Sequence, residues 1–284
     1  MHLFFNLVHI SQFVIKTIAP SSPIPKKHIE CFYIYEGKPN STFRYVAFPH
    51  FNTGLSFFNG ACVHRQNWSL QISENTDAGV HIEILGKYTT PVLLEYKGQL
   101  REISIVFKPL GLNRFFSDNY ISIAPKFSQE LTNDLWSQFG ESLFSGNDDI
   151  GKIESFLLSQ FWDNPALISI ENALTFLENS NEQISISDIA NKVGLNLKTF
   201  QRHFQKHMGC SPVEYRRICR FRSSLINKLN STQLKNLTEI TYEEGYYDQS
   251  YLIKEFRKIT NHNPKDFFKS TSKVDGDKII WEIK

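Results

Sequence analysis

The sequence predicts an α+β chain, with a β-rich domain first, as a sandwich or small barrel with trailing helices, and an all-α domain after it. Six short runs of aromatic and β-branched residues lie between residues 30 and 109. Apolar residues then recur at helical spacing, and beyond residue 188 one helical pattern occurs twice. A length of 284 residues suits two domains of ordinary size.

The predicted strands are runs that end at or next to Gly or Pro, as strands do where a turn follows. They cover residues 30–37, 42–49, 54–61, 79–86, 91–98 and 101–109. The spacing of apolar residues predicts helices within residues 111–119, 129–139 and 149–162.

The last of these helices carries one apolar stripe, made of Ile150, Ile153, Phe156, Leu157 and Phe161. Such a stripe usually docks on its own domain, and a contact between two copies in a homodimer stays open as the alternative. The next segment, "DNPALIS", predicts a linker. The expected organisation is therefore a regulatory domain at 1–162, a linker at 163–169, a helical domain at 170–270 and a tail at 271–284.

The charge of the chain is unevenly distributed. Residues 181–270 carry 15 Lys and Arg against 9 Asp and Glu, a net charge of +6, while the rest carries 16 against 20, a net charge of −4. A polyanionic partner for the C-terminal third follows as one interpretation, and ordinary solvated helix faces as the other.

The location predicted for the chain is the cytoplasm, without membrane association. The four cysteines (Cys31, Cys62, Cys210 and Cys219) form no Cys-x-x-Cys pair, which favours a reduced compartment. The apolar residues 1–16 lack a basic leader and a cleavage site, and their longest apolar run is too short to span a bilayer.

The duplicated pattern places a glycine between two helices. Ile189 and Ala190 precede Gly194 by five and four residues, as Ile240 and Thr241 precede Gly245. Each copy continues with a Phe of the buried stripe, a Pro eight residues after it and an aromatic residue three positions after the Pro. These are Phe204, Pro212 and Tyr215 in the first copy and Phe256, Pro264 and Phe267 in the second. Glycine permits the positive φ of a sharp turn, so each copy predicts a helix-turn-helix whose second helix can enter a DNA major groove.

The outward face of each second helix predicts the contacts. With Leu197, Phe200, Phe204 and Met208 as the buried stripe, the first copy points Lys198, Gln201, Arg202 and Gln205 away, and these side-chain types hydrogen-bond base edges or phosphates. In the second copy Leu252, Phe256 and Ile259 are expected inside and Ser250, Ile253, Lys254 and Arg257 outside. Because Ile253 is apolar, this helix is expected mainly to hold phosphates, with contact between Ile253 and a thymine methyl group as the alternative.

A rigid helix is expected between the copies, over residues 211–229, with Ser211 as N-cap and Pro212 at its first position. Its length of about 27 Å, with the flanking helix radii, approaches one turn of B-DNA. Its Arg216, Arg217, Arg220 and Arg222 are expected to pair with acids, with phosphate contact as the alternative.

These residues resemble the DNA-binding domain of the AraC/XylS family of bacterial transcription regulators, through "SISDIANKVGLNLKTFQRHFQKHMGCSPVEYRR" and "LTEITYEEGYYDQSYLIKEFRKITNHNPKDFF". The resemblance implies seven helices with two helix-turn-helix units. The expected DNA-binding residues are Lys198, Thr199, Gln201, Arg202, Gln205, Gln249, Ser250, Tyr251, Lys254 and Arg257. Thr241, Tyr246 and Asn261 depart from the family's usual Ala, Phe and Gly.

Residues 21–37 and 103–116 look like the sensory domain of an AraC-type subgroup, which implies a cupin-like barrel with a small-molecule effector pocket or a dimer contact. The sequence identifies no cofactor, metal or ligand. His50, His64 and His81 are scattered without a His-x-His pair, so a cupin-type metalloenzyme is not expected. Double-stranded DNA is the expected partner, and activation the expected sign of regulation. Helical units that bind protein, such as RNA polymerase, with little affinity for DNA remain the competing interpretation.

Overall fold

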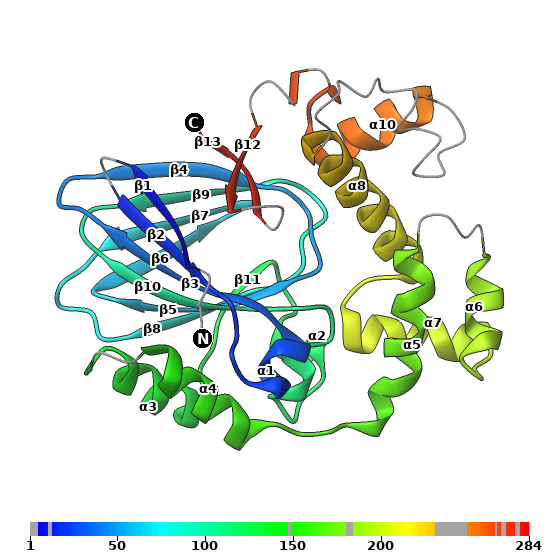
Figure 1. The fold of residues 1–284 in the computed structure, drawn as a ribbon, viewed down its shortest axis with the longest axis horizontal. Coiled ribbons are helices and arrows are strands. Elements are labelled where there is room, and N and C mark those ends of the chain that lie inside the picture. The colour runs from blue at the N-terminus through cyan, green and yellow to red at the C-terminus, as the bar shows by residue number, and fades with distance from the viewer. Residues whose placement is uncertain are drawn as a thin grey trace.

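The computed structural model describes residues 5–10, 13–146, 149–179, 184–230, 249–264, 266–267, 271–275 and 279–283. It is an α+β chain in which two sheets form the N-terminal part and helices the C-terminal part (Figure 1). One sheet has the order β1-β2-β3-β10-β5-β8-β11 and the other the order β12-β13-β4-β9-β7-β6. The strands are β1 (Phe5–Ile10), β2 (Phe13–Ile18), β3 (Ile29–Gly37), β4 (Thr42–Ala47), β5 (Thr53–Asn59), β6 (Ala61–Gln66), β7 (Ser69–Glu74), β8 (His81–Leu85), β9 (Val92–Lys97), β10 (Arg101–Phe107), β11 (Ser128–Glu130), β12 (Thr271–Asp275) and β13 (Ile279–Ile283).

The described helices are α1 (Pro23–His28), α2 (Tyr120–Ile123), α3 (Asp134–Leu143), α4 (Asp149–Gln160), α5 (Ile168–Glu178), α6 (Ile186–Lys192), α7 (Leu197–Met208), α8 (Pro212–Asn230) and α10 (Gln249–Thr260). Short 3₁₀ turns lie at Leu112–Arg114 and Pro165–Leu167. Helices α3 and α4 cover the outer face of the seven-stranded sheet (Figure 1).

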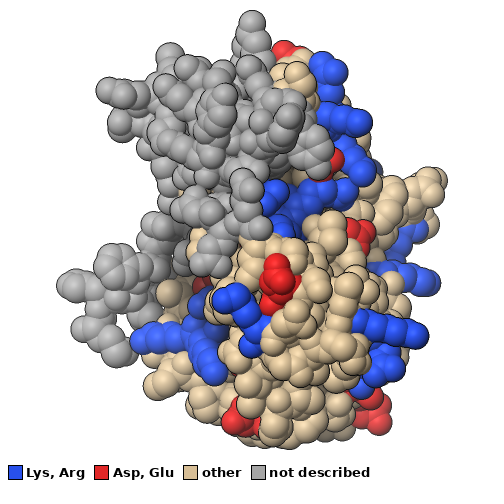
Figure 2. All heavy atoms as spheres, turned by 90° about the vertical axis from the view of Figure 1, so that its right-hand side faces the viewer, with Lys and Arg blue, Asp and Glu red and all other residues tan. Residues whose placement is uncertain are grey.

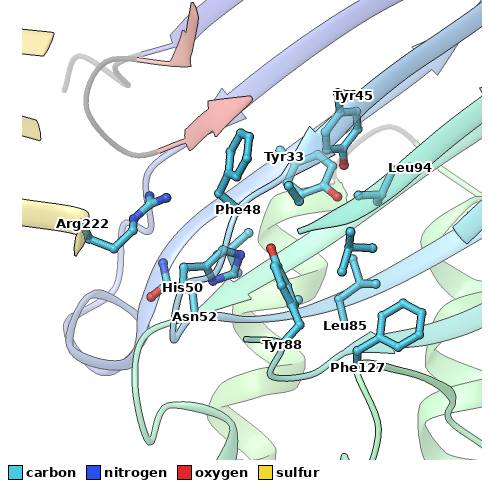
Figure 3. A pocket seen from close by; sticks show the side chains of 14 residues that line it. Tyr33, Tyr45, Phe48, His50, Asn52, Leu85, Tyr88, Leu94, Phe127 and Arg222 are labelled. Atoms are coloured by element: carbon cyan, nitrogen blue, oxygen red, sulfur yellow. The ribbon is translucent and has the colours of Figure 1, made fainter. Parts of the chain in front are cut away.

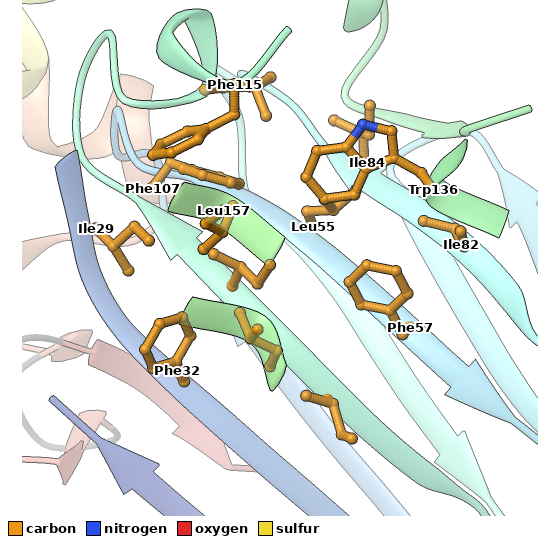
Figure 4. Close-up of a cluster of buried hydrophobic side chains, with 14 of the residues drawn as sticks. Ile29, Phe32, Leu55, Phe57, Ile82, Ile84, Phe107, Phe115, Trp136 and Leu157 are labelled. Carbon is orange, nitrogen blue, oxygen red and sulfur yellow. The ribbon is translucent and has the colours of Figure 1, made fainter. Parts of the chain in front are cut away.

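The alternation of side chains along each strand builds two cores on opposite faces of that sheet. Phe32 and Ile34 of β3 join the core under α3 and α4, whereas Tyr35 points to the core between the sheets. Figure 4 shows the first core, which contains Trp136 of α3 and Leu157 of α4 together with Phe57 and Ile84 of the sheet. The apolar stripe of α4 therefore docks on its own domain: Ile153 and Leu157 are fully buried, and Ile150, Phe156 and Phe161 pack beside them.

Two of the helix predictions are partly wrong. Residues 111–119 hold only the 3₁₀ turn Leu112–Arg114, and this turn follows a left-handed residue, Leu110, at φ 63°. Within 129–139 the helix begins only at Asp134, because residues 128–130 form a strand that pairs with the edge of β8. Asn133 caps that helix through a hydrogen bond from the Trp136 amide to its Oδ1 (3.2 Å).

The structure adds strands that the residue pattern did not predict. Strand β2 pairs with β3 and extends the sheet, and β6 and β7 form a hairpin at the edge of the second sheet. At the other end of the chain, β13 pairs with β4 through Trp281–Ala47, Glu282–Val46 and Ile283–Tyr45. The segment after the helical domain therefore returns to the β-rich part.

The helical part packs directly against the β-rich part. Leu167, which lies in the segment expected as a linker, is fully buried in the core of the helices. Phe51 and Leu110 from the β-rich part join that same core. A second shared core contains Val46 and Phe48 together with residues of α8 and α10.

Candidate nucleic-acid interface

The first unit, residues 186–215, is a helix-turn-helix. Ser185 caps α6 and Asn196 caps α7, through hydrogen bonds from the amides of Asp188 (3.0 Å) and Thr199 (2.9 Å). Between the helices Gly194 has φ 73°, the left-handed conformation that the sequence predicted for it. Ala190 is fully buried, and its small side chain lets the two helices approach.

The outward face of α7 has the predicted residues. Phe200, Phe204 and Met208 are buried, and the exposed residues are Lys198, Gln201, Arg202, Gln205 and Lys206. Thr199 is half-buried at the start of the helix. Leu197, predicted as part of the buried stripe, is 39% exposed because it is the first helical residue, beyond the reach of the core.

The second unit, residues 240–267, is described in part. Helix α10 buries Leu252, Phe256 and Ile259 and exposes Ser250, Lys254 and Arg257, as predicted, whereas Ile253 is half-buried. Residues 231–248, with the predicted first helix, Thr241, Gly245 and Tyr246, lie outside the described residues, as do the side chains of Gln249 and Tyr251.

The ends of α7 and α10 show the repeat directly. Gly209 (φ 66°) and Asn261 (φ 63°) lie five residues after the equivalent Phe204 and Phe256, and both adopt the left-handed conformation. Their amides donate to the carbonyls of Gln205 and Arg257, each at 2.8 Å. Asparagine tolerates this conformation better than other non-glycine residues, which explains why Asn261 can stand where glycine is usual.

Helix α8 connects the two units. A reciprocal pair caps it as predicted: the Glu214 amide donates to Ser211 Oγ (3.2 Å), and the Ser211 amide donates to Glu214 Oε2 (2.9 Å). Its 19 residues span about 28 Å. Ile218 packs in the core of the first unit, and Phe221 and Leu225 pack in that of the second. Helices α7 and α10 thus lie at opposite ends of α8 (Figure 1).

The four arginines of α8 are half-buried. Arg217 Nε is 3.6 Å from Glu255 Oε2 of α10, an ion pair between α8 and the second unit. Burial lowers the pKa of Arg216 and of Arg222. The view of the molecule from the side of α6 and α10 shows Lys and Arg side chains spread over the described surface, with fewer Asp and Glu among them (Figure 2).

A cavity of about 100 Å³ opens between the sheets close to α8 (Figure 3). Its described lining is mostly aromatic and aliphatic and includes Tyr33, Tyr45, Leu85, Val92, Leu94 and Phe127. At one end lie His50, Asn52, Tyr88 and Arg222, of which only Arg222 comes from the helical part. Burial and the Arg222 charge lower the pKa of His50 to about 3, so its imidazole is neutral at pH 7. The sequence did not single out Arg222 or His50 for this position, because nothing local marks it.

Within the described part of the chain, no helix is long and apolar enough to cross a membrane. Among the same residues, no three His, Cys, Asp or Glu side chains are grouped so that they could hold a metal ion.

Two protein families match this chain. Residues 189–270 match a family described as a helix-turn-helix domain, and residues 16–125 match a domain of unknown function, DUF6597. An uncharacterized HTH-type transcriptional regulator of Bacillus subtilis, YdeC, is 30% identical over 91 residues, which are 32% of this chain and 31% of the relative. Another, encoded in the cgkA 5′ region of Pseudoalteromonas carrageenovora, is 28% identical over 104 residues, 36% of this chain and 60% of the relative. The matched regions thus span about one third and three fifths of these relatives.

Solved structures show weaker likeness. ToxT from Vibrio cholerae aligns over 84% of this chain and 97% of its own, with a TM-score of 0.45 and 12% identity. The DNA-binding domain of AdpA in complex with a target DNA aligns over 37% of this chain and 90% of its own, with a TM-score of 0.30 and 22% identity.

Proposed function

We propose that this chain, which carries a helix-turn-helix domain of the AraC type at residues 189–270, is a transcription regulator that binds double-stranded DNA with both units. One observation carries the proposal: α7 exposes basic and amide side chains and α10 exposes basic ones, at opposite ends of one helix of about 28 Å. Successive major grooves on one face of B-DNA lie about 34–36 Å apart, a distance that this arrangement approaches once the helix radii are added.

In the proposed complex the first unit reads sequence. Lys198, Gln201 and Arg202 contact base edges, since Arg and Lys pair with guanine and Gln with adenine. Thr199 and Gln205 contact the backbone beside them. The second unit contributes less to sequence preference, because half-buried Ile253 occupies the position of Gln201. Its contacts come from Gln249, Ser250, Tyr251, Lys254 and Arg257, mainly with phosphates.

The cavity in the β-rich domain is the proposed effector site. Its described lining is apolar apart from a few hydroxyl, amide and imidazole groups and one guanidinium, and it holds no acid. This chemistry suits a small apolar molecule with a carboxylate directed at Arg222. Octanoate should therefore raise the melting temperature of the chain while octanamide does so less, and Arg222→Met should remove the difference. Equal shifts with both probes would contradict a carboxylate site.

The proposed regulator acts in the cytoplasm as an activator, alone or as a homodimer, and contacts RNA polymerase once bound. The test of DNA binding is selection of bound fragments from genomic DNA, followed by a salt titration of the selected duplex. Phosphate contacts release counterions, so affinity should fall steeply with added salt. Failure to enrich any sequence, with equal weak binding to all duplexes, would favour units that bind protein instead.

A further inference from the structure

The loop between β4 and β5, residues 48–52, reaches three places at once. Phe48 packs in the core of the second unit, with its ring 4.7 Å from that of Phe267. Phe51 packs in the core of the first unit, where its ring stacks on Tyr215 at 4.0 Å. Both phenylalanines are buried, at 1% and 7% exposure. One five-residue loop of the β-rich domain therefore contributes a ring to the core of each unit.

The same loop lines the cavity. His50 and Asn52, which alternate with Phe51, lie at the cavity end beside Arg222, and Phe48 lies at its edge (Figure 3). The Nδ1 atom of His50 is buried without a hydrogen bond of good geometry, and the backbone of Asn52, in the same loop, interacts with the imidazole. An occupant of the cavity would thus contact the loop through both His50 and Phe48.

The loop is stiff between His50 and the two packed rings. Pro49 joins Phe48 to His50, and its ring fixes φ near −65°, which removes one of the soft torsions between them. The two phenylalanine rings are packed among aromatic neighbours at interior density, where a displaced side chain must displace others. A shift of His50 is consequently passed on to packed rings and cannot be absorbed in a flexible loop.

We infer that residues 48–52 couple the cavity to both units: an occupant that displaces His50 and Asn52 moves Phe48 and Phe51 and so changes the packing behind α10 and α7 together. Phe48 and Phe51 are positioning residues in this account, since they lie behind the helices and not on their outward faces. The biological role of this coupling rests on the proposed function, because the coupled helices carry the proposed DNA contacts. The physical coupling itself needs neither DNA nor a natural ligand.

The test fills the cavity by mutation. Val92, on β9, lines the cavity and is buried, so Val92→Phe places a ring inside it without any added ligand. Amide hydrogen exchange of the full chain is then followed in peptides covering α7 and α10. Exchange in both helices should change at least about threefold relative to the parent chain, because local opening depends on the packing behind each helix. Leu94→Phe fills the same cavity from a second position, in case Val92→Phe does not fold.

The coupling is isolated by loosening the loop. Pro49→Gly keeps the side chains of Phe48, His50, Phe51 and Asn52, removes only the buried ring of Pro49, and should abolish the response of both helices to the filled cavity. Pro39→Gly, at an exposed proline in the β3–β4 turn, is the control for the added backbone freedom alone and should leave the response intact. Phe48→Leu should reduce the response of α10 only, and Phe51→Leu that of α7 only. A filled cavity without effect on either helix, or a response that survives Pro49→Gly, overturns the inference. If the coupling holds but no duplex is bound, the proposed DNA function fails and the coupling does not.

Discussion

Arg114 and Glu171 form an ion pair between the β-rich domain and the first helix of the helical part. Arg114 is 1% exposed, and its Nη2 donates to Oε1 of Glu171 in the first turn of α5. Its Nη1 donates to Asp163 Oδ1 (2.9 Å) and to the carbonyl of Asn164 (3.2 Å). The guanidinium therefore fixes the segment at 163–171 to the domain that precedes it.

Of the two acids that bind Arg114, Glu171 should contribute more to the free energy of unfolding than Asp163. Glu171→Gln leaves a buried charge with weaker compensation and is expected to lower the free energy of unfolding by about 2 kcal/mol. Asp163, whose side chain is 85% exposed, should contribute less than about 1 kcal/mol, so Asp163→Asn is the matched control. Urea unfolding gives the free energy of unfolding of both variants. Equal decreases in the two variants would show that Glu171 stabilises the fold no more than Asp163 does.

Arg202 tests base reading by the first unit. Arg202→Ala is expected to weaken binding to the selected duplex by about 1–3 kcal/mol and to relax base preference at one position. Fluorescence anisotropy with selected and scrambled duplexes measures both effects. Lys126 is exposed and lies about 60 residues before the first unit in the sequence, so Lys126→Ala is the control for loss of one positive charge. A uniform loss on both duplexes would mean that Arg202 contacts phosphate only.

Replacing Ile253 tests whether the second unit reads bases or mainly contacts phosphates. It is half-buried between exposed Ser250 and Lys254, so Ile253→Ser should leave the preferred half-site almost unchanged. Repeating the fragment selection with this variant gives the answer. A markedly different selected sequence would show that α10 reads bases, including thymine methyl groups through Ile253.

Buried histidines should make the protein sensitive to acid. Burial and the nearby Arg114 charge lower the pKa of His28 to about 4, below the value near 6.5 of an unfolded chain. Between these values the unfolded state binds the extra proton, so the free energy of unfolding falls as pH falls from about 6.5 to 4. His50 and His207, with pKa values lowered to about 3 and about 4 by burial, act in the same direction.

Replacing one histidine should flatten this dependence. His28→Gln is expected to reduce its slope by up to about 1.4 kcal/mol per pH unit, the contribution of one proton. Urea unfolding at pH 7, 6 and 5 measures the slope. The exposed His64, changed to Gln in the same way, should leave it unaltered. An unchanged slope in His28→Gln would mean that His28 is protonated in the folded protein.

The helical units were predictable because their signals are local. Turn glycine, capping residues and the Phe–Pro–aromatic spacing all act within a few residues, and the match of residues 189–270 to a helix-turn-helix domain agrees with the prediction drawn from them. Strand β6 was missed because its side chains alternate between exposed and half-buried after Ala61, which leaves little apolar pattern. Contacts between the domains could not be predicted either. Phe48, Phe51, Arg114 and Arg222 meet partners far away in sequence, and no local spacing marks such pairs.

Footprinting of the full chain on its selected duplex tests two-unit binding most directly. Hydroxyl-radical protection should appear on one face of the DNA in two patches about one helical turn apart. Arg202→Ala should weaken one patch and Lys254→Ala the other. A single protected patch that both variants weaken equally would contradict the binding of DNA by two units held apart by α8.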